Sequence, residues 1–466
     1  MTQKQIDFPL PEKPKEIIDD PEERLKFVLS NDLDFHNQNH LNNAVYNFHS
    51  FPAKFPPQIP KLFIQQLTEP GDVVLDPMAG SGTTLIESKL SGRYGIGFDI
   101  DPLSLLMTKV KLSHFNSNEI IEIAHSILKN ARDKFTSRTI QDFYELHNWN
   151  KSTIKFANYW FAEHIQKQLF ALISEIDSLR GKYRNFFRLI FSSLIITKHG
   201  GVSYGLDLAH TRPHRAKVVY DERGNLLLDG DLSKYSERRR EILTKTIKAP
   251  FEVFLQKAKS NIESVLPESD TFKSSYVSYG DAQSIPLQND HVDLIVTSPP
   301  YASMAIDYMR AHKFSLIWFG HSIDCLGNKR SEYLGGDAIQ NVEYETMPNK
   351  VKEIIETVAN EDQKKGKTLH RYYSEMTRVL QECFRVLKPG KSAIFVVGTS
   401  TMRGIDTQID QCLTHIGQSL GFKVPKIAIR YLDRNKRMLP VGDTVNKNSM
   451  IQNRMHTEQV IGFLKP

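Results

Sequence analysis

The sequence predicts an α/β fold in which helices cover both faces of a mostly parallel sheet. Two observations predict it. Short apolar runs, each ending at or near a polar or glycine-containing turn, occur at residues 73–75, 94–98, 294–296 and 393–397. Signals for the start of a helix follow the first two runs, at Thr83 and at Pro102. Strands that alternate with helices are typical of parallel sheets, because a parallel connection has to cross over the sheet.

Composition and charge narrow the class of protein. Of the 466 residues, 40% are hydrophobic and 24% are charged, which is ordinary for a soluble globular protein of more than one unit. A net charge of +6 is compatible with a nucleic-acid partner. The three cysteines contain no CxxC pair, so we expect no disulfide framework, no metal and a reducing, cytoplasmic location. The sequence has no apolar run of about 18 residues and begins without a secretory signal, so we expect no membrane partner.

The chain divides into an arm and a split sheet domain. Residues 1–45 are expected to form an N-terminal arm, a mobile terminus with a short helix near residues 22–29. Residues 46–112 and 273–466 carry the predicted strands and together form the sheet domain.

Two insertions interrupt the sheet domain. Residues 113–272 are predicted to be a helical insertion, because apolar residues recur three or four positions apart in 165–179 and fill 186–196 almost completely. Pro250 begins a further helix there. A second, more polar insertion is expected at 320–368.

A glycine loop follows the first predicted strand, in the segment DPMAGSGTT at residues 76–84. Glycines at the carboxyl end of a parallel strand let a ligand lie against the backbone. Leu85 occupies the position where a dinucleotide fingerprint has a small residue, and no Walker lysine follows, so the pattern favours an adenosine ligand without a pyrophosphate. Asp99 ends the next strand and is expected to bind the two ribose hydroxyls. Asp101 is the alternative ribose ligand, or else a helix cap.

A second motif, TSPPY at residues 297–301, follows the predicted strand at 294–296. Its consecutive prolines, Pro299 and Pro300, stiffen the chain and expose carbonyls that no ladder bond uses. The Tyr301 ring can stack on a planar group, while Ser298 Oγ and the Pro299 carbonyl accept the hydrogens of its amine. The alternative is a Pro-Pro loop with a packed tyrosine.

Together, DPMAGSGTT and TSPPY resemble the S-adenosylmethionine-dependent DNA amino-methyltransferases. The resemblance implies a Rossmann-like methyltransferase fold, whose mostly parallel seven-stranded sheet has an antiparallel last strand, for which residues 457–464 fit. It makes the sheet domain the catalytic domain and S-adenosylmethionine the cofactor. Ser298, in the first place of the tetrapeptide, is similar to the cytosine-N4 branch, whereas adenine-N6 enzymes more often carry Asp or Asn there.

The resemblance also implies the site residues. Those expected to be catalytic are Ser298, Pro299, Pro300 and Tyr301. Segment 49–57 resembles the part of the family that closes over the methionine end of the cofactor, and Asp281 resembles the acid near the adenine ring. The residues expected to bind the cofactor are Phe51, Lys54, Phe55, Asp76, Pro77, Gly80, Ser81, Gly82, Thr83, Thr84, Asp99 and Asp281.

Basic segments are candidates for contacts to double-stranded DNA. They contain Lys198, Arg212, Arg215 and Lys217 in the first insertion, and Arg434, Lys436 and Arg437 near the end of the chain. For the first group the alternative is a solvated loop. The insertion 113–272 is the candidate target-recognition module, although the resemblance leaves open which insertion reads the DNA.

The sequence thus predicts a site-specific enzyme that methylates the N4 amine of a flipped-out cytosine. A cysteine nucleophile for carbon-5 methylation is absent from the motifs. The alternatives are adenine-N6 methylation, a non-catalytic DNA-recognition subunit and, less favoured, RNA methylation. A cognate restriction endonuclease or defence-system subunit is a further expected partner.

Overall fold

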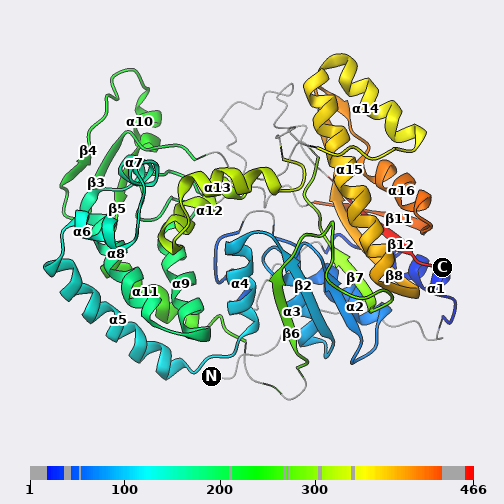
Figure 1. Cartoon of the computed structure of the whole chain (residues 1–466), viewed down its shortest axis with the longest axis horizontal. Coiled ribbons are helices and arrows are strands. Elements are labelled where there is room, and N and C mark those ends of the chain that lie inside the picture. Colours follow the sequence, from blue (N-terminus) through cyan, green and yellow to red (C-terminus); the bar gives the residue numbers. More distant parts are fainter. Residues whose placement is uncertain are drawn as a thin grey trace.

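A seven-stranded sheet organises the sheet domain in the computed structural model (Figure 1), which describes residues 18–35, 44–51, 54–208, 213–266, 269, 272–302, 307–336, 342–432 and 457–466. Its strand order is β11–β12–β8–β7–β1–β2–β6. The strands are β1 (Val73–Asp76), β2 (Tyr94–Asp99), β6 (Ser275–Tyr279), β7 (Val292–Thr297), β8 (Leu387–Gly398), β11 (Lys423–Tyr431) and β12 (Thr457–Leu464). β12 pairs antiparallel with both β8 and β11, and the other pairs are parallel. The predicted Rossmann-like sheet with an antiparallel last strand is confirmed.

Alternate residues of the strands face two different helix layers. Leu75 and Ile295 face a cluster with α14 (Asn349–Glu361), α15 (Gln363–Val386) and α16 (Ile409–Ser419). Val74 and Leu294 face the opposite cluster, with α1 (Pro21–Val28) and α2 (Gln58–Leu67). α3 (Thr83–Leu90) and α4 (Pro102–Leu112) follow β1 and β2, as predicted.

The N-terminal segment differs from the mobile terminus that we expected. In residues 18–35, Leu25, Val28 and Leu29 of the α1 region are buried against the sheet. Gly462 in β12 permits this approach, because a Cβ there would lie 2.5 Å from Leu29 Cδ1. The apolar spacing of one short helix did not reveal which surface would cover it.

The first insertion is mainly helical and lies beside the sheet (Figure 1). Its helices are α5 (Ser117–Ser137), α6 (Ile140–Leu146), α7 (Lys151–Trp160), α8 (Glu163–Ser178), α9 (Gly181–Ile195), α10 (Glu237–Leu243) and α11 (Pro250–Ile262). The predicted helices at 165–179, at 186–196 and from Pro250 are confirmed as α8, α9 and α11.

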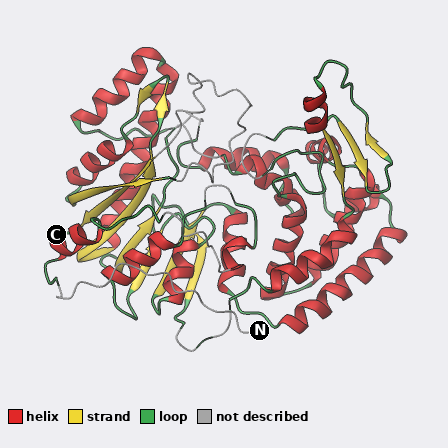
Figure 2. Ribbon diagram, turned by 180° about the vertical axis from the view of Figure 1, so that it is seen from behind, coloured by secondary structure: helices red, strands yellow, loops and turns green. Residues whose placement is uncertain are grey.

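The insertion also contains a sheet that we did not expect. β3 (Val218–Asp221) pairs with β4 (Leu226–Leu228) and with β5 (Thr244–Ile247). Figure 2 shows this small sheet separated from the large one by helices. The short strands lack a strong alternating pattern, because their exposed faces carry apolar residues such as Leu226.

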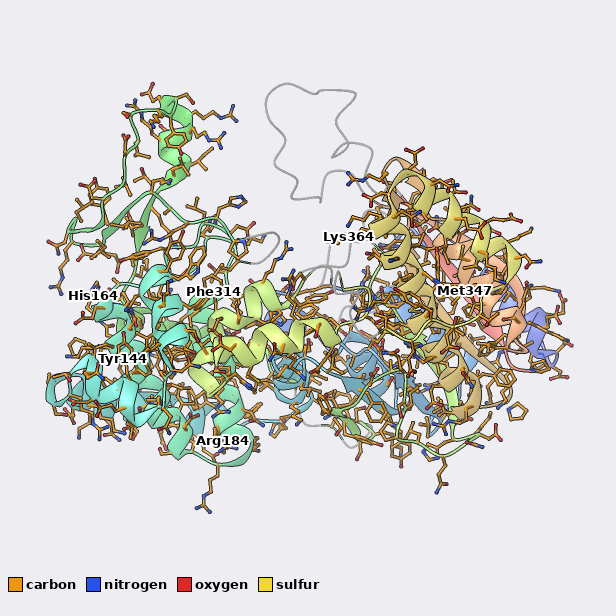
Figure 3. All side chains as sticks on the ribbon, turned by 45° about the horizontal axis from the view of Figure 1, so that its top comes forward. Tyr144, His164, Arg184, Phe314, Met347 and Lys364 are labelled. Carbon is orange, nitrogen blue, oxygen red and sulfur yellow. The ribbon has the colours of Figure 1, made fainter. Side chains whose placement is uncertain are left out.

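The remaining elements lie between the two parts or cover the sheet. They are η1 (Ala44–Asn47), α12 (Met309–Leu316), η2 (Ile317–Phe319), α13 (Ile323–Lys329), η3 (Arg330–Glu332), β9 (Thr401–Met402) and β10 (Ile405–Asp406). Phe314 and Trp318 join the core of the insertion, which also includes Leu103 and Met107 of α4. In Figure 3, Phe314 lies on the insertion side, whereas Met347, just before α14, and Lys364, in α15, lie on the side of the large sheet. None of the helices in the described ranges is long and apolar enough to cross a membrane.

Candidate functional site

The glycine loop and the tetrapeptide lie at the same edge of the sheet. β1 and β7 are parallel neighbours, so their carboxyl ends meet there. Thr297 Oγ1 donates a hydrogen bond of 2.8 Å to Asp76 Oδ1, and Thr84 Oγ1 donates one of 3.2 Å to the Val296 carbonyl. These two hydrogen bonds join the end of β7 to the end of β1 and to the start of α3, so the two motifs begin side by side.

Asp76 is a buried carboxylate below this edge. Its side chain also accepts a 3.2 Å hydrogen bond from the Met78 backbone N–H. Burial raises the pKa of Asp76 to about 6, although its hydrogen bonds favour the charged form. Asp76 thus fixes the start of the glycine loop, and Pro77 after it is buried.

The glycine loop has a backbone that only glycine adopts readily. Gly80 and Gly82 have φ values of +49° and +81°, and a Cβ on Gly82 would lie 2.7 Å from the Thr108 side chain. Lys111 Nζ donates to the Ser81 carbonyl at 2.8 Å. The side chains of Ser81, Thr83 and Thr84 are buried. The loop therefore presents mainly backbone to a ligand, and the Thr84 hydroxyl is already bonded to β7.

Asp99 lies at the end of β2, facing the glycine loop. Its Oδ2 accepts a 2.7 Å hydrogen bond from Gly80 N, and its Oδ1 accepts one of 2.8 Å from Asp101 N. Burial, and next the like charge of Asp101, raise the pKa of Asp99 to about 7. Asp101 caps α4 through Leu103 N and Ser104 N, so the alternative interpretation of Asp101 as a helix cap is confirmed.

The third acid lies at the same edge but in a different environment. Asp281 follows β6, whose Tyr279 is the register partner of Asp99. It is exposed and accepts a 2.9 Å hydrogen bond from Gln283 N. The structure therefore brings Asp76, Asp99 and Asp281 to the ends of three strands of one sheet edge.

Phe51 covers the glycine loop from the segment before the sheet. A Cβ on Gly80 would lie 3.5 Å from a ring carbon of Phe51. The Phe51 ring also stacks on Tyr308, with ring centroids 5.0 Å apart and an interplanar angle of 18°. Phe51 thus contacts the glycine loop.

The other two predicted residues of that segment differ from Phe51. Lys54 Nζ donates to the Tyr46 carbonyl at 2.6 Å, and burial followed by repulsion from Lys198 lowers the pKa of Lys54 to about 8. Phe55 packs with the α1 and α2 cluster on a face of the sheet. The alternation of apolar residues along 49–57 did not distinguish Phe51 from Phe55. Residues 52–53 lie outside the described part of the chain.

The tetrapeptide follows β7. Ser298 Oγ donates its hydrogen to the Val396 carbonyl at 3.0 Å and also interacts with the Tyr301 hydroxyl, and a serine oxygen that donates once can still accept. The Tyr301 hydroxyl lies 3.3 Å from Glu458 Oε1 on β12. Burial, and next the Glu458 charge, raise the pKa of Tyr301 well above its usual value. Pro299 is buried and Pro300 is half-buried.

Only some of the predicted DNA contacts can be placed. Lys198 and Lys217 are exposed on the first insertion. The Arg215 guanidinium lies over two rings, 4.3 Å from the Tyr159 centroid and 5.2 Å from the Tyr204 centroid, which fixes it against the insertion. Outside the described residues lie Arg212, Arg434, Lys436 and Arg437.

The sequence interpretation missed three side chains beside Asp99. Tyr308 stacks on Phe51, while His312 and Tyr333 contact Asp101. A signal was present: His312 and Ser315 are three residues apart and both buried on α12, and the half-buried Tyr308, four residues before His312, directly precedes that helix. Polar residues on a buried helix face indicate partners inside the protein.

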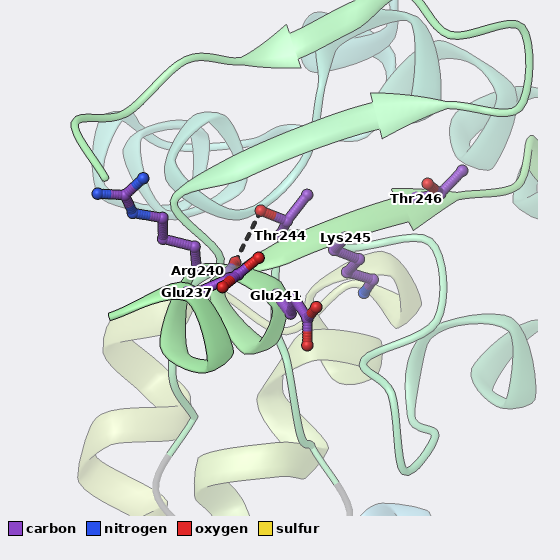
Figure 4. Close-up of a pocket in the computed structure, with 6 residues that line it drawn as sticks. All are labelled: Glu237, Arg240, Glu241, Thr244, Lys245 and Thr246. Carbon is purple, nitrogen blue, oxygen red and sulfur yellow. Dashed lines mark hydrogen bonds between the residues drawn. The ribbon is translucent and has the colours of Figure 1, made fainter. Parts of the chain in front are cut away.

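A hollow on the first insertion contains none of the predicted site residues. Its lining residues come from α10 and β5 (Figure 4): Glu237, Arg240, Glu241, Thr244, Lys245 and Thr246. Lys245 Nζ donates to the Ser203 and Gly205 carbonyls, each at 2.7 Å. The lysine therefore braces the loop that follows Lys198.

The amino-acid sequence matches known methyltransferases. A family model described as DNA methylase matches residues 11–109 and 292–448, and one described as an RMKL-like methyltransferase domain matches residues 65–160. The chain is 22% identical over 462 residues to the Type II methyltransferase M.MvaI from Kocuria varians, covering 93% of this chain and 94% of that protein. It is 24% identical over 437 residues to M.BsoBI from Geobacillus stearothermophilus, covering 84% and 81%. Among solved structures, a SAM-dependent methyltransferase from Methanosarcina mazei has 9% identity and a TM-score of 0.29, covering 86% of this chain and 96% of that one.

The residues at the edge fit the cofactor that this family uses. The nonpolar wall of Phe51, the backbone of the glycine loop and the acid Asp99 suit an adenosine with a thioether or sulfonium side chain, and the loop has no phosphate-binding lysine. S-adenosylmethionine is the cofactor.

The family match spans both motifs, and the sheet brings those motifs to one edge. The protein belongs to the DNA methylase family that modifies exocyclic amino groups of DNA bases, and it is a site-specific DNA amino-methyltransferase.

Proposed function

We propose that this methyltransferase acts on the N4 amine of cytosine in double-stranded DNA, with the target base flipped out of the helix. The observation that carries the proposal is the direction of the hydrogen bond made by the Ser298 hydroxyl. Its hydroxyl hydrogen is donated to the Val396 carbonyl. The Ser298 oxygen is therefore suited to accept a hydrogen bond from an amine rather than to donate one. A serine in this first position resembles the cytosine-N4 branch, whereas Asp or Asn is more frequent in adenine-N6 enzymes.

The chain's own residues then orient the amine. Ser298 Oγ and the Pro299 carbonyl accept its two hydrogens and draw the nitrogen lone pair out of conjugation with the ring. Tyr301 lies three residues further on and supplies a ring for stacking. When bound, the cofactor supplies a methyl group on a positively charged sulfur. Phe51, the glycine loop and Asp99 would hold the cofactor so that the methyl group would pass to this nitrogen, with the thioether as the leaving group and one proton released from the nitrogen to solvent.

Positioning is the main physical contribution. Asp99 and the Gly80 backbone lie at the end of β2 and after β1, and Ser298 lies after the neighbouring β7. Holding two reactants in line contributes roughly 7–11 kcal/mol to lowering a barrier. A base inside a duplex is out of reach, so flipping costs a few kcal/mol, which stacking on Tyr301 offsets in part by about 1–3 kcal/mol.

For DNA binding we propose residues 113–272 as the target-recognition module, with Lys198 and Lys217 as exposed contacts to phosphates. Arg215 is proposed to support this surface, because its guanidinium is held by Tyr159 and Tyr204. Arg212, Arg434, Lys436 and Arg437 keep their proposed contacts to DNA on sequence grounds alone.

The direct test is to incubate the protein with labelled S-adenosylmethionine and plasmid DNA, digest the DNA to nucleosides and identify the labelled one by mass spectrometry. We expect N4-methylcytosine. N6-methyladenine as the labelled product would replace the cytosine assignment with its rival. Sequence-specific DNA binding without any labelled base would indicate a recognition subunit instead of an active enzyme. An RNA substrate in a parallel reaction is expected to stay unlabelled.

We also propose that the methyl mark protects DNA from a cognate restriction endonuclease in the cytoplasm. The relatives M.MvaI and M.BsoBI are named Type II methyltransferases, and the first of them matches over nearly the whole chain. Plasmid from cells that express this protein is expected to resist an endonuclease encoded beside it.

A further inference from the structure

The Asp101 carboxylate accepts more hydrogen bonds than a helix cap requires. Oδ1 accepts from Leu103 N at 2.7 Å and from Ser104 N at 3.1 Å, which is the cap of α4. Oδ2 accepts from the Tyr333 hydroxyl at 2.7 Å and lies 2.7 Å from His312 Nδ1. The side chain of Asp101 is buried. One oxygen thus serves the helix, and the other binds side chains from more than 200 residues later in the chain.

Asp101 is joined in turn to the proposed ribose acid. Its backbone N–H donates to Asp99 Oδ1 at 2.8 Å, and Gly80 N donates to Asp99 Oδ2 at 2.7 Å. An unbroken series of hydrogen bonds therefore leads from Tyr333 and His312 through Asp101 to Asp99, and ends in the glycine loop.

The environment of His312 indicates a role beyond filling space. The imidazole is completely buried, with the Phe51 ring 5.8 Å and the Tyr308 ring 5.9 Å away between centroids. Its Nε2 is buried and has no hydrogen-bond partner within the described structure. A buried unpaired nitrogen is costly, so an apolar side chain would pack here at lower cost if packing were the whole requirement. The contact that distinguishes histidine from leucine is the one between Nδ1 and Asp101.

The charges of this cluster are consistent with Nδ1 as the donor. Burial acts to raise the pKa of Asp101, but the neighbouring His312 and the hydrogen bonds to the carboxylate outweigh burial and hold that pKa below its usual value. An ionised carboxylate only accepts, so the hydrogen between the two groups belongs to Nδ1.

We propose that His312 and Tyr333 are positioning residues for Asp99: by holding Asp101 from α12 and from the residue after η3, they fix the acid that binds the cofactor ribose. This inference rests on the proposed role of Asp99 in cofactor binding. His312 and Tyr333 both lie in the part of the chain that follows the tetrapeptide at residues 298–301. Cofactor affinity is therefore expected to depend on this part of the chain as well as on the glycine loop and β2. Neither residue touches the cofactor in this arrangement; each acts through Asp101.

The test measures S-adenosylhomocysteine binding by calorimetry in single variants of the full chain. Tyr333→Phe removes only the hydroxyl, His312→Leu removes both ring nitrogens, and His312→Asn keeps a donor near the position of Nδ1. Loss of a hydrogen bond to a charged group corresponds to roughly 10- to 100-fold in affinity, and we expect only the lower part of this range because both residues act through Asp101. We expect roughly tenfold weaker binding for His312→Leu, a few-fold for Tyr333→Phe, and partial recovery in His312→Asn.

Ser315→Ala is the matched control on the same helix. Ser315 Oγ is buried and hydrogen-bonded to Ser192 Oγ at 2.8 Å, and it has no contact to Asp101. Its loss is expected to lower the melting temperature and leave cofactor affinity unchanged. In methyl-transfer assays, Tyr333→Phe is expected to raise KM for S-adenosylmethionine with kcat preserved, because the reacting atoms are not touched.

The outcomes separate this inference from the proposed function. If Tyr333→Phe and His312→Leu bind S-adenosylhomocysteine within twofold of the wild type, the positioning role is wrong, whatever base is methylated. Should His312→Leu fail to fold, Tyr333→Phe decides alone, because it keeps the ring. If the Asp99→Ala variant binds S-adenosylhomocysteine as tightly as the wild type does, the proposed role of Asp99 is wrong. The inference about His312 and Tyr333 is then wrong as well.

Discussion

The two halves of the site edge are built differently. On the cofactor side, after β1 and β2, the carboxylates of Asp76, Asp99 and Asp101 together accept backbone hydrogen bonds from Met78, Gly80, Asp101, Leu103 and Ser104. On the proposed target side, after β7, Ser298 donates to the Val396 carbonyl, and the Tyr301 hydroxyl interacts with the side chains of Glu458 and Ser298. The proposed cofactor half is therefore fixed mainly by backbone hydrogen bonds, whereas the proposed target half is fixed mainly by contacts of the Ser298 and Tyr301 side chains. Substitutions in the first half are therefore expected to change mainly cofactor affinity, and substitutions in the second half to change mainly kcat.

The largest effect is expected from Ser298→Ala, which removes the proposed acceptor of the amine. By analogy with the removal of one preorganised hydrogen-bonding group at a reacting centre, kcat should fall roughly 100- to 1,000-fold. Affinity for S-adenosylhomocysteine should be preserved, since the cofactor half is untouched. Single-turnover methylation of plasmid DNA measures the loss.

Ser392→Ala is the control for Ser298→Ala. Ser392 is buried on β8, in register with Leu294, well before the strand ends at Gly398. Its removal should leave turnover near that of the wild type. Full activity in the Ser298→Ala variant would contradict the assignment of the catalytic serine.

The second effect concerns Asp99→Ala, which should weaken S-adenosylhomocysteine binding by roughly 10- to 100-fold. Each hydrogen bond to a charged group is worth about 1.5–3 kcal/mol, and a tenfold change in affinity is about 1.4 kcal/mol. Calorimetry checks this value. Asp72→Ala, just before β1 and at the opposite end of the strand, should not change the affinity; an equal loss in both variants would remove Asp99 from the site.

Cofactor affinity should also depend on pH through Asp99. Its pKa is raised to about 7, with Asp101, Asp76 and Tyr308 as the neighbouring titratable groups, so the protonated form grows as the pH falls below 7. A protonated acid loses an acceptor for the ribose, so affinity should decrease by up to about tenfold per pH unit below 7 and be level above it. Calorimetry from about pH 5.5 to 8.5 would show this, and Asp99→Asn should give a flat profile. A flat profile in the wild type would contradict the prediction.

A smaller effect is expected from Thr297→Val, which removes one of the two hydrogen bonds between the ends of β1 and β7 and the start of α3. Thr297 is completely buried and donates to the buried carboxylate of Asp76, so the free energy of unfolding should fall by about 1–3 kcal/mol. Urea unfolding measures this change. Thr357→Val on α14, whose hydroxyl bonds only the Glu353 carbonyl of its own exposed helix face, should stay within about 0.5 kcal/mol. Equal losses would show that the bond between Thr297 and Asp76 does not join the halves.

The smallest effect concerns the insertion. Lys217→Ala should weaken DNA binding nearly equally for all sequences and reduce the slope of log affinity against log salt by about one. Fluorescence anisotropy at several salt concentrations measures the slope, with Lys259→Ala on α11 as a control for another exposed lysine. An unchanged slope for Lys217→Ala would exclude it from the interface.

Much of the fold could be predicted from the sequence, because its signals are local. The apolar runs became β1, β2, β7 and β8, Pro102 begins α4 behind its Asp101 cap, and residues 457–464 form the antiparallel strand β12. The small sheet of the insertion and the packing of α1 were not predicted. In both cases, contacts between segments far apart in the chain decide which surface is covered, and a short apolar pattern fits several surfaces equally well.

The same division applies to the site. The sequence by itself determined the two motifs and the ligand class. Each motif lies in one short segment, with Gly80 and Gly82 in the first and the prolines after Ser298 in the second, and Asp99 ends a single strand. The chemistry of these residues does not depend on knowing which distant segments pack beside them. Only the tertiary structure decided that Phe51 and not Phe55 covers the loop, and that His312 and Tyr333 reach Asp101. The physical reason is that hydrogen bonds and ring contacts depend on distances of a few ångströms between elements, and these distances are set by packing of the whole chain.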